Sequence, residues 1–136
     1  MVSAPQAAVA QHRTFNYAVV AVDFAFRGIP GVLPNGTYNT NFINLGHAPH
    51  VIVPINLGPE CADLTRAELI AAFDLGEEGF FEMCPDASVG GEAFAFGGER
   101  AKAPLTLTPG RTVFACFVNR HYALGMISET TVINIG

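Results

Sequence analysis

Alternating apolar and polar positions recur along most of this 136-residue chain. The first such run, residues 14–26, is rich in aromatic and β-branched residues, and Pro34-Asn-Gly36 marks a turn before the next one. A period of two residues is typical of β-strands, and Gly, Pro and Asn clusters mark the turns between them. The number and spacing of the runs predict seven or eight strands, as in a β-sandwich. The clearest strands are expected over 14–26, 37–44, 50–57, 105–108, 112–118 and 129–135.

Only one segment has the pattern of a helix. Thr65 and Glu68 have the spacing of a capping box, in which each side chain accepts a hydrogen bond from the backbone of the other residue. Apolar residues behind this pair predict one helix of about ten residues that ends near Gly76. Residues 74–100 mix acidic, Gly-rich and aromatic segments, and we expect them to form a long structured loop. The predicted fold class is therefore all-β, with one short helix inserted between strands.

Length and composition favour a single domain over residues 1–136. A chain of this length can bury a core without needing disulfides. Half of its residues are hydrophobic, only 14% are charged, and 14 Gly and 9 Pro favour strands and turns over helices. Residues 1–13, which include His12, show no clear period, and we expect them to be flexible or loosely attached.

Charge and hydropathy exclude two classes of partner. The net charge of -5 argues against nucleic acid, because phosphate binding needs clustered Lys and Arg. No apolar run reaches the roughly 20 residues that span a bilayer, and Asp23 interrupts the best candidate. The first residues lack the basic and apolar regions of a signal peptide, so we expect a mature form that has been given a starting Met.

Candidate chemistry is concentrated near the C-terminus. Cys116, His121 and Met126 place a thiolate, an imidazole and a thioether within eleven residues. Composition alone predicts this exact spacing on the order of 0.002 times in this chain, and roughly 0.02 times if three spacings are allowed for each gap, so the pattern is fairly specific. Two histidines and a cysteine in a trigonal plane, with a weak axial methionine, are the ligands of blue-copper electron-transfer sites. The segment therefore predicts a copper site that needs one more histidine.

The pattern Cys116-x4-His121-x3-Gly125-Met126 resembles the C-terminal ligand loop of the cupredoxins, the azurin, plastocyanin, auracyanin and rusticyanin group. The longer, azurin-like loop is the better match. This resemblance extends from about residue 17 to residue 135, although only the two ligand segments are specific. It implies a Greek-key β-sandwich or barrel that holds one copper ion, which alternates between Cu(I) and Cu(II).

The second ligand segment, Asn44-Leu-Gly46-His47-Ala-Pro49-His50, resembles the cupredoxin turn in which a histidine opens an apolar strand. By this match His50 completes a ligand set with Cys116, His121 and Met126. His47 is the alternative, and the strand that starts directly after His50 favours His50. Many cupredoxins have a small polar residue after this histidine, whereas this chain has Val51.

The resemblance implies a one-electron carrier that serves a redox protein donor and acceptor, and a monomer. We do not expect an enzyme, because no open metal position and no separate acid, base and nucleophile are evident. Tyr122 and Leu124 are expected to form part of an apolar docking patch around a surface-reaching His121. A copper storage or delivery protein and a metal-free interaction domain are the alternative functions. Location in the periplasm or outside the cell is expected by analogy with the family.

The two remaining cysteines, Cys61 and Cys84, lie on either side of the predicted helix. If Cys116 binds copper, they form the even count that an oxidising compartment favours, and a disulfide between them is our hypothesis. Two unpaired, partly buried thiols are the alternative.

Overall fold

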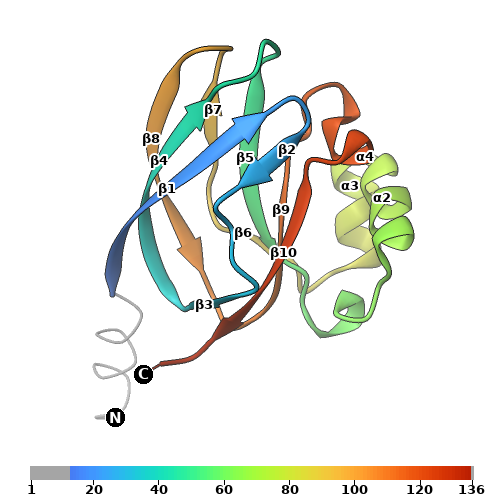
Figure 1. The fold of residues 1–136 in the computed structure, drawn as a ribbon. Coiled ribbons are helices and arrows are strands. Elements are labelled where there is room, and N and C mark those ends of the chain that lie inside the picture. Colours follow the sequence, from blue (N-terminus) through green and yellow to red (C-terminus); the bar gives the residue numbers. More distant parts are fainter. Residues whose placement is uncertain (1–12, 136) are drawn as a thin grey trace.

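The computed structural model describes residues 13–135 as two β-sheets packed face to face, with helices outside one of them (Figure 1). The prediction for residues 1–13 falls almost entirely outside the described residues. Within them the predicted strands are present, so the mostly-β sandwich is confirmed. The strands are β1 (Thr14–Val22), β2 (Ala25–Arg27), β3 (Val32–Pro34), β4 (Gly36–Asn44), β5 (His50–Asn56), β6 (Ser88–Val89), β7 (Ala93–Ala95), β8 (Arg100–Leu107), β9 (Gly110–Ala115) and β10 (Ile127–Ile133).

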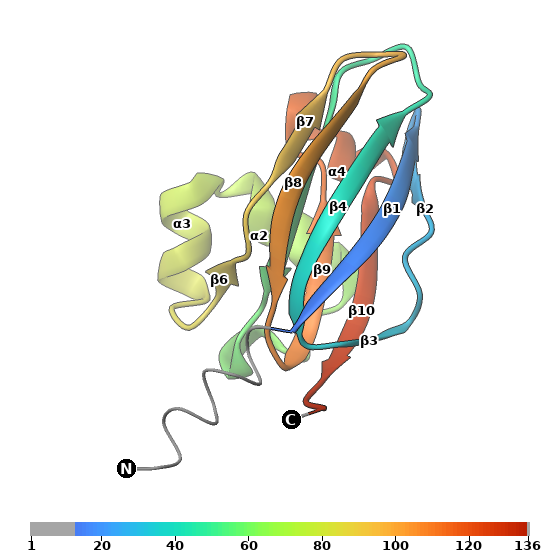
Figure 2. The same ribbon diagram turned by 90° about the vertical axis from the view of Figure 1, so that its left-hand side faces the viewer.

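The first sheet has the strand order β2-β1-β4-β8, and the second has the order β3-β10-β9-β5-β6, with β7 also paired to β5. β1 pairs with β4 in parallel, and so does β10 with β3, whereas the other strand pairs are antiparallel. Figure 2 shows the first sheet from its outer side, with β9 and β10 behind it. Strands distant in sequence thus become neighbours, which brings β5 beside β9.

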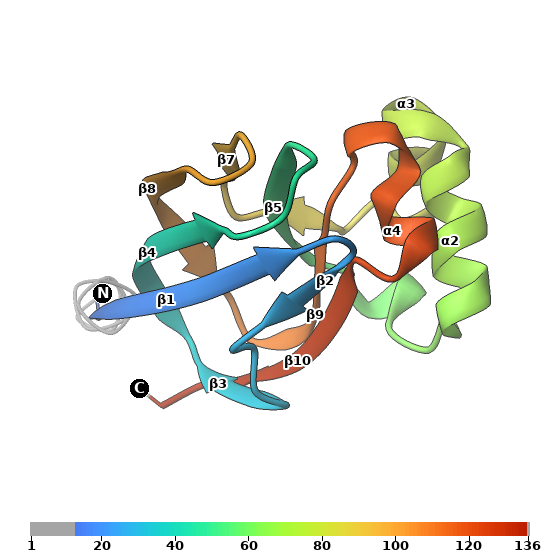
Figure 3. The ribbon, with the colours of Figure 1, turned by 45° about the horizontal axis from the view of Figure 1, so that its top comes forward.

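Burial differs between strands because the helices cover part of the outer face of the second sheet, over β5 and the end of β9 (Figure 3). β4 alternates, with Tyr38 and Phe42 buried and Asn39 exposed, as expected of a strand with one face in water. β5 is buried at every position except its last residue, and β9 is buried over its last four residues. The inner faces of β5 and β9 meet the first sheet, and the helices lie on their outer side (Figure 3).

The helical insertion contains two helices rather than the single one predicted. The first, α2 (Arg66–Asp74), starts with the expected capping box: the Glu68 amide donates to Thr65 Oγ1 at 3.1 Å, and the Thr65 amide donates to Glu68 Oε1 at 2.8 Å. The second, α3 (Gly76–Met83), lies in the segment 74–100 that was expected to be a loop, as do β6 and β7. That expectation was wrong. None of the helices within residues 13–135 is long and apolar enough to cross a membrane.

Packing explains why α3 is helical despite two glycines in eight residues, which lower its intrinsic helix propensity. Its Phe80 ring is buried and lies 5.2 Å from the Phe73 ring of α2, centroid to centroid. This tertiary contact stabilises a helix that local sequence preference does not indicate.

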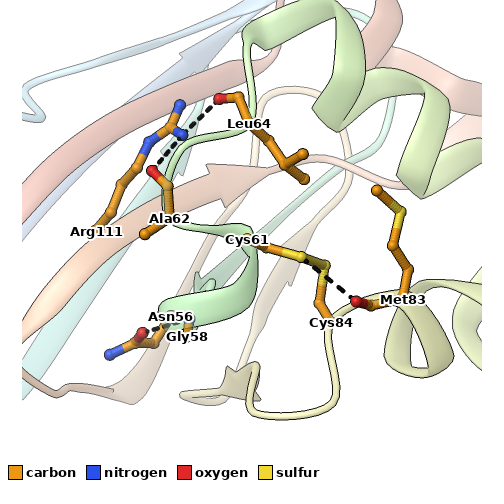
Figure 4. Close-up of a disulfide and its surroundings, with 8 residues drawn as sticks. All are labelled: Asn56, Gly58, Cys61, Ala62, Leu64, Met83, Cys84 and Arg111. Atoms are coloured by element: carbon orange, nitrogen blue, oxygen red, sulfur yellow. Dashed lines mark hydrogen bonds between the residues drawn. A yellow bond between two sulfur atoms is a disulfide. The ribbon is translucent and has the colours of Figure 1, made fainter.

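A disulfide between Cys61 and Cys84 fastens the helical insertion at both ends (Figure 4), which confirms the predicted pairing. Cys61 ends the short 3-10 helix η1 (Pro59–Cys61), and Cys84 follows α3. Close by, Arg111 of β9 donates from Nη1 to the Ala62 carbonyl at 2.9 Å, as Figure 4 also shows. The insertion is therefore attached to the second sheet by covalent and polar contacts.

Candidate metal centre

Three of the predicted ligands meet at one end of the sandwich. The sulfur of Cys116 lies 3.6 Å from Nδ1 of His121 and 3.9 Å from Nδ1 of His50, and the two Nδ1 atoms are 3.2 Å apart. All three side chains are buried, and no ligand atom of the cluster is more than 4.8 Å from another. The fold thus brings together residues that are up to 71 positions apart in the sequence.

Neighbouring strands position His50 and Cys116. His50 is the first residue of β5, and Cys116 follows the last residue of β9. The antiparallel register pairs Val53 with Ala115, so the start of β5 lies beside the end of β9. The amide of Val51 donates to the Cys116 sulfur at 3.4 Å and orients it toward the two imidazoles.

A tight loop brings His121 back over Cys116. It consists of the 3-10 turn η2 (Val118–Arg120) and the short helix α4 (His121–Leu124). Asn119 and Arg120 have φ values of 45° and 55°, and this left-handed pair reverses the chain. The Tyr122 amide then donates to the Cys116 carbonyl at 2.9 Å and closes the turn.

Met126 is fully buried beside this loop. Its amide donates to the His121 carbonyl, and its carbonyl accepts from the Cys116 amide, both at 3.1 Å. The backbone of Met126 is therefore tied to two of the clustered residues. Its part as the axial ligand stays a prediction.

The donor set fits one copper ion. A metal bonded to nitrogen at about 2.0 Å and to sulfur at about 2.3 Å, with three donors in a plane, separates these donors by roughly 3.5 to 3.8 Å. The observed separations run from 3.2 to 3.9 Å, so little movement is needed to receive the ion. A thiolate with two imidazoles, buried away from water, suits copper in both of its common oxidation states.

No protein-family model matches the sequence, and no curated protein matches it either. Solved structures do match. Dithionite-reduced auracyanin from Roseiflexus castenholzii superposes with a TM-score of 0.59 at 24% identity, over 87% of this chain and 96% of that one. Auracyanin A from Chloroflexus aurantiacus gives 0.56 at 19% identity, over 89% and 100% of the two chains. Reduced rusticyanin gives 0.53 at 14% identity, over 95% and 92%.

The fold is the cupredoxin fold. At these levels of sequence identity the similarity supports the fold alone. The assignment of a copper site therefore depends on the donor residues of this chain. Those residues occupy the end of the sandwich where β5 begins and β9 ends. The cupredoxin resemblance of the two sequence segments and the geometry of the cluster therefore point to the same site.

The protonation states of the cluster follow from its burial. Burial raises the pKa of the Cys116 thiol, although backbone hydrogen bonds from Val51 and Val118 act in the opposite direction. Burial also lowers the pKa of His121, and the nearby His50 imidazole adds to this effect. A neutral imidazole keeps its lone pair for a metal, and a bound metal displaces the thiol proton. Binding of an ion at Cys116 would therefore be accompanied by loss of the thiol proton.

Asp23 is the first of two residues around the cluster that the sequence alone did not identify. It lies in the turn between β1 and β2, and its Oδ1 accepts a hydrogen bond from His50 Nε2 at 2.6 Å. The same carboxylate accepts from the amides of His47 at 2.9 Å and Ala48 at 3.3 Å. These hydrogen bonds lower the pKa of Asp23. The bond from the His47 amide has the largest effect, and the bond from the His50 imidazole also contributes. The only local signal was an acidic residue within an apolar run.

The loop before His50 is shaped around this carboxylate. A Cβ atom at Gly46 would come within 2.3 Å of Asp23 Oδ1, so the close approach requires glycine. The buried Asn44 side chain supports the loop by donating to the Ala48 carbonyl at 2.9 Å and accepting from the Gly46 amide at 2.8 Å. His47 points its side chain to solvent and is not in the cluster, so His50 is the correct choice between the two.

Phe24, also missed, covers the two histidines. Its ring centroid lies 4.7 Å from that of His121 and 6.0 Å from that of His50. His121 is only 5% exposed as a result of this packing, so the expected surface-reaching imidazole is instead covered by a phenyl ring. Phe24 itself is 36% exposed and forms the outer surface at this point.

The expected docking residues differ in exposure. Leu124 is 61% exposed and is available to a partner, but Tyr122 is only 5% exposed, so its predicted docking role was wrong. The Tyr122 hydroxyl donates to Asp74 Oδ1 at 2.6 Å, and Arg120 binds both oxygens of the same carboxylate at 2.8 Å. Tyr122 is thus an anchor between the ligand loop and the end of α2.

Proposed function

We propose that this chain is a type 1 copper protein that carries single electrons between redox partners. The observation that carries the proposal is the buried cluster of His50, Cys116 and His121, whose donor atoms already face one another at metal-binding separations. Because the donor atoms are already in place without the ion, their positions need to change little when copper gains or loses an electron. Small rearrangement favours rapid electron transfer.

Each residue has a defined part in this proposal. Copper supplies a one-electron exchange between Cu(II) and Cu(I). Cys116 binds as a thiolate whose sulfur is oriented by the Val51 amide, and His50 is held with Nδ1 facing the site because Nε2 is bonded to Asp23. Phe24 excludes water from the imidazole edges. Met126 is the proposed axial ligand.

Partners would dock where the surface is apolar and the distance to His121 is short. Phe24 and Leu124 are exposed, and both are close to this histidine, one by ring contact and the other in the same helical turn. Electron-transfer encounters are small and weak, so a few apolar side chains suffice for docking and release. We propose a monomer with a redox protein donor and acceptor.

The surroundings of the site favour electron transfer over the alternatives. All three donors are buried and Phe24 covers the two imidazoles, which restricts access for a substrate and hinders the release expected of a copper delivery protein. The Cys61–Cys84 disulfide agrees with a location in the periplasm or outside the cell, where disulfides persist.

The test is a titration of the protein with Cu(II), followed by visible absorption spectroscopy. We expect an intense blue or green thiolate-copper band that saturates at one ion per chain and is absent from Cys116→Ser. Chemical reduction should bleach the band and reoxidation should restore it. A wild-type protein that stays colourless at saturating copper would overturn the redox proposal. Rapid loss of Cu(I) to a competing chelator would instead favour copper delivery.

A further inference from the structure

A groove of about 560 Å³ lies between the helical insertion and the outer face of the second sheet. Its floor consists of Val51, Val53 and Ile55 of β5 together with Phe73 and Phe80 of the helices, all of them buried. These three β5 residues lie at every second position, so they share one face of the strand. The groove is thus apolar at its base.

The opening of the groove is aromatic and negatively charged. Phe94 and Phe117 line it and are 42% and 39% exposed. Two carboxylates also line the groove. Glu77 belongs to the first turn of α3, and Glu92 lies just before β7. Among the described residues that line the groove there is no Lys, Arg or His. An apolar floor beneath two carboxylates and two phenyl rings is complementary to a ligand with an apolar body and a positively charged group.

We propose that this groove binds a small amphiphilic cation, meaning an aliphatic or aromatic body that carries an ammonium or similar group. The volume lies within the range of small-molecule sites, and the apolar floor accounts for the body of the ligand. A cation at the opening would be attracted by Glu77 and Glu92 and by the faces of the aromatic rings. An anionic amphiphile of the same length would meet only the repulsion of the two carboxylates.

The groove also adjoins the metal cluster. Val51 contributes its side chain to the floor and its amide to the Cys116 sulfur, and Phe117 directly follows Cys116. A bound ligand would therefore contact residues that orient the thiolate. This link rests on the proposed function, whereas binding itself does not require copper.

Binding is tested by calorimetry on the metal-free full chain with decyltrimethylammonium and decyl sulfate, each below its micelle concentration. We expect the cation to bind at least tenfold more tightly than the anion, because attraction to each of the two exposed carboxylates contributes roughly threefold for the cation and the anion is repelled. The Glu77→Gln/Glu92→Gln double variant should lose this preference. The matched control is Glu78→Gln/Glu82→Gln, which makes the same change of net charge on exposed α3 residues outside the groove. The control should retain the preference.

A second variant separates the apolar contribution from the charges. Phe94→Ala should weaken the binding of both amphiphiles through lost apolar contact, and that of the cation more because the ring face also attracts the positive charge. It removes a partly exposed ring rather than a core residue. Three results would overturn the proposal: neither amphiphile binds, both bind with equal affinity, or the two double variants have equal effects. So would a dimer in sedimentation experiments that Phe94→Ala dissociates, since that result would assign the groove to a second copy.

Copper-loaded protein provides a separate observation. At a concentration that half-saturates the wild type, decyltrimethylammonium should shift the thiolate-copper band of the wild type, and the shift in Glu77→Gln/Glu92→Gln should be several-fold smaller. If the copper titration fails while calorimetry shows selective binding, the proposed function is wrong and the groove remains a cation site. If copper binds and calorimetry shows none, only the groove proposal is overturned.

Discussion

Asp23 accepts a hydrogen bond from His50 Nε2 at 2.6 Å, across 27 positions of sequence. Because Nε2 is occupied by this bond, Nδ1 is the nitrogen that faces Cys116 and His121. A carboxylate in this position fixes the tautomer and ring orientation of a metal-binding histidine and increases its basicity. The turn between β1 and β2 therefore supports a cluster whose donor residues, His50, Cys116 and His121, lie far along the sequence.

Replacing Asp23 should change the properties of bound copper. We expect Asp23→Ala to weaken Cu(II) binding roughly 10- to 100-fold, the usual effect of removing such a partner. Asp23→Asn keeps an oxygen acceptor but removes the charge, so the reduction potential should rise because Cu(II) loses more stabilisation than Cu(I). Voltammetry and competition titrations measure the two effects.

A matched control for the charge is Asp86→Asn. Asp86 packs against Gly58, beyond the end of β5 opposite to His50. Its substitution should leave the potential almost unchanged. Equal potentials for wild type and Asp23→Asn would show that the Asp23 charge does not tune the site.

The clustered donor residues could be predicted from the sequence, but the residues that support them could not. Cys116 and His121 are recognisable because copper requires particular donor atoms, and a short loop fixes their spacing. Asp23 and Phe24 act through contacts made only in the folded chain, and neither belongs to a local motif. Tyr122 is adjacent to a ligand and was expected at the surface, yet a carboxylate at the end of α2 draws its hydroxyl inward.

The elements of the fold also divide into those that a local sequence pattern predicts and those that depend on tertiary contacts. The alternation of β4 and the continuous apolar run of β5 predict their strands, and the capping box at Thr65 predicts the start of α2. α3 was missed because its stability depends on Phe80 packing on Phe73, a contact that no periodicity within eight residues reveals. The pairing of Cys61 with Cys84 followed from counting cysteines, which is independent of secondary structure.

Phe24 should control access to His121. In Phe24→Ala the imidazole edge would become exposed, so we expect faster electron exchange with a small inorganic oxidant and faster loss of copper to a chelator. Stopped-flow spectroscopy measures both rates. Leu124→Ala is the control, since this side chain is exposed and does not need to move for His121 to be reached. Unchanged rates in Phe24→Ala would contradict a covering role.

The Cys61–Cys84 disulfide should stabilise the fold without affecting the metal site. The bridge closes a loop over a sequence separation of 23, for which chain entropy predicts about 3 kcal/mol. The double variant Cys61→Ala/Cys84→Ala should therefore lose about that much free energy of unfolding in urea. Its thiolate-copper band should match that of the wild type. A changed band would show that the insertion helps to shape the copper site.

Asp74 should make the stability of the ligand loop dependent on pH. The Arg120 guanidinium, and then the Tyr122 hydroxyl, hold the pKa of this carboxyl below its usual range. A lowered carboxyl pKa means that the ionised form is favoured in the folded state. Its stabilisation is thus fully present above the ordinary value of about 3.9 and is lost as pH falls through the lower folded pKa.

The variant Asp74→Asn isolates this contribution. We expect it to unfold at a lower urea concentration than the wild type at neutral pH, and the difference should shrink as pH falls below about 4. Tyr122→Phe keeps the Arg120 ion pair and should show a smaller effect. Because Arg120 and Tyr122 flank His121, Asp74→Asn should also release copper faster. A stability difference that persists in acid, where the carboxyl is protonated in both states, would mean that the substitution acts through packing rather than charge.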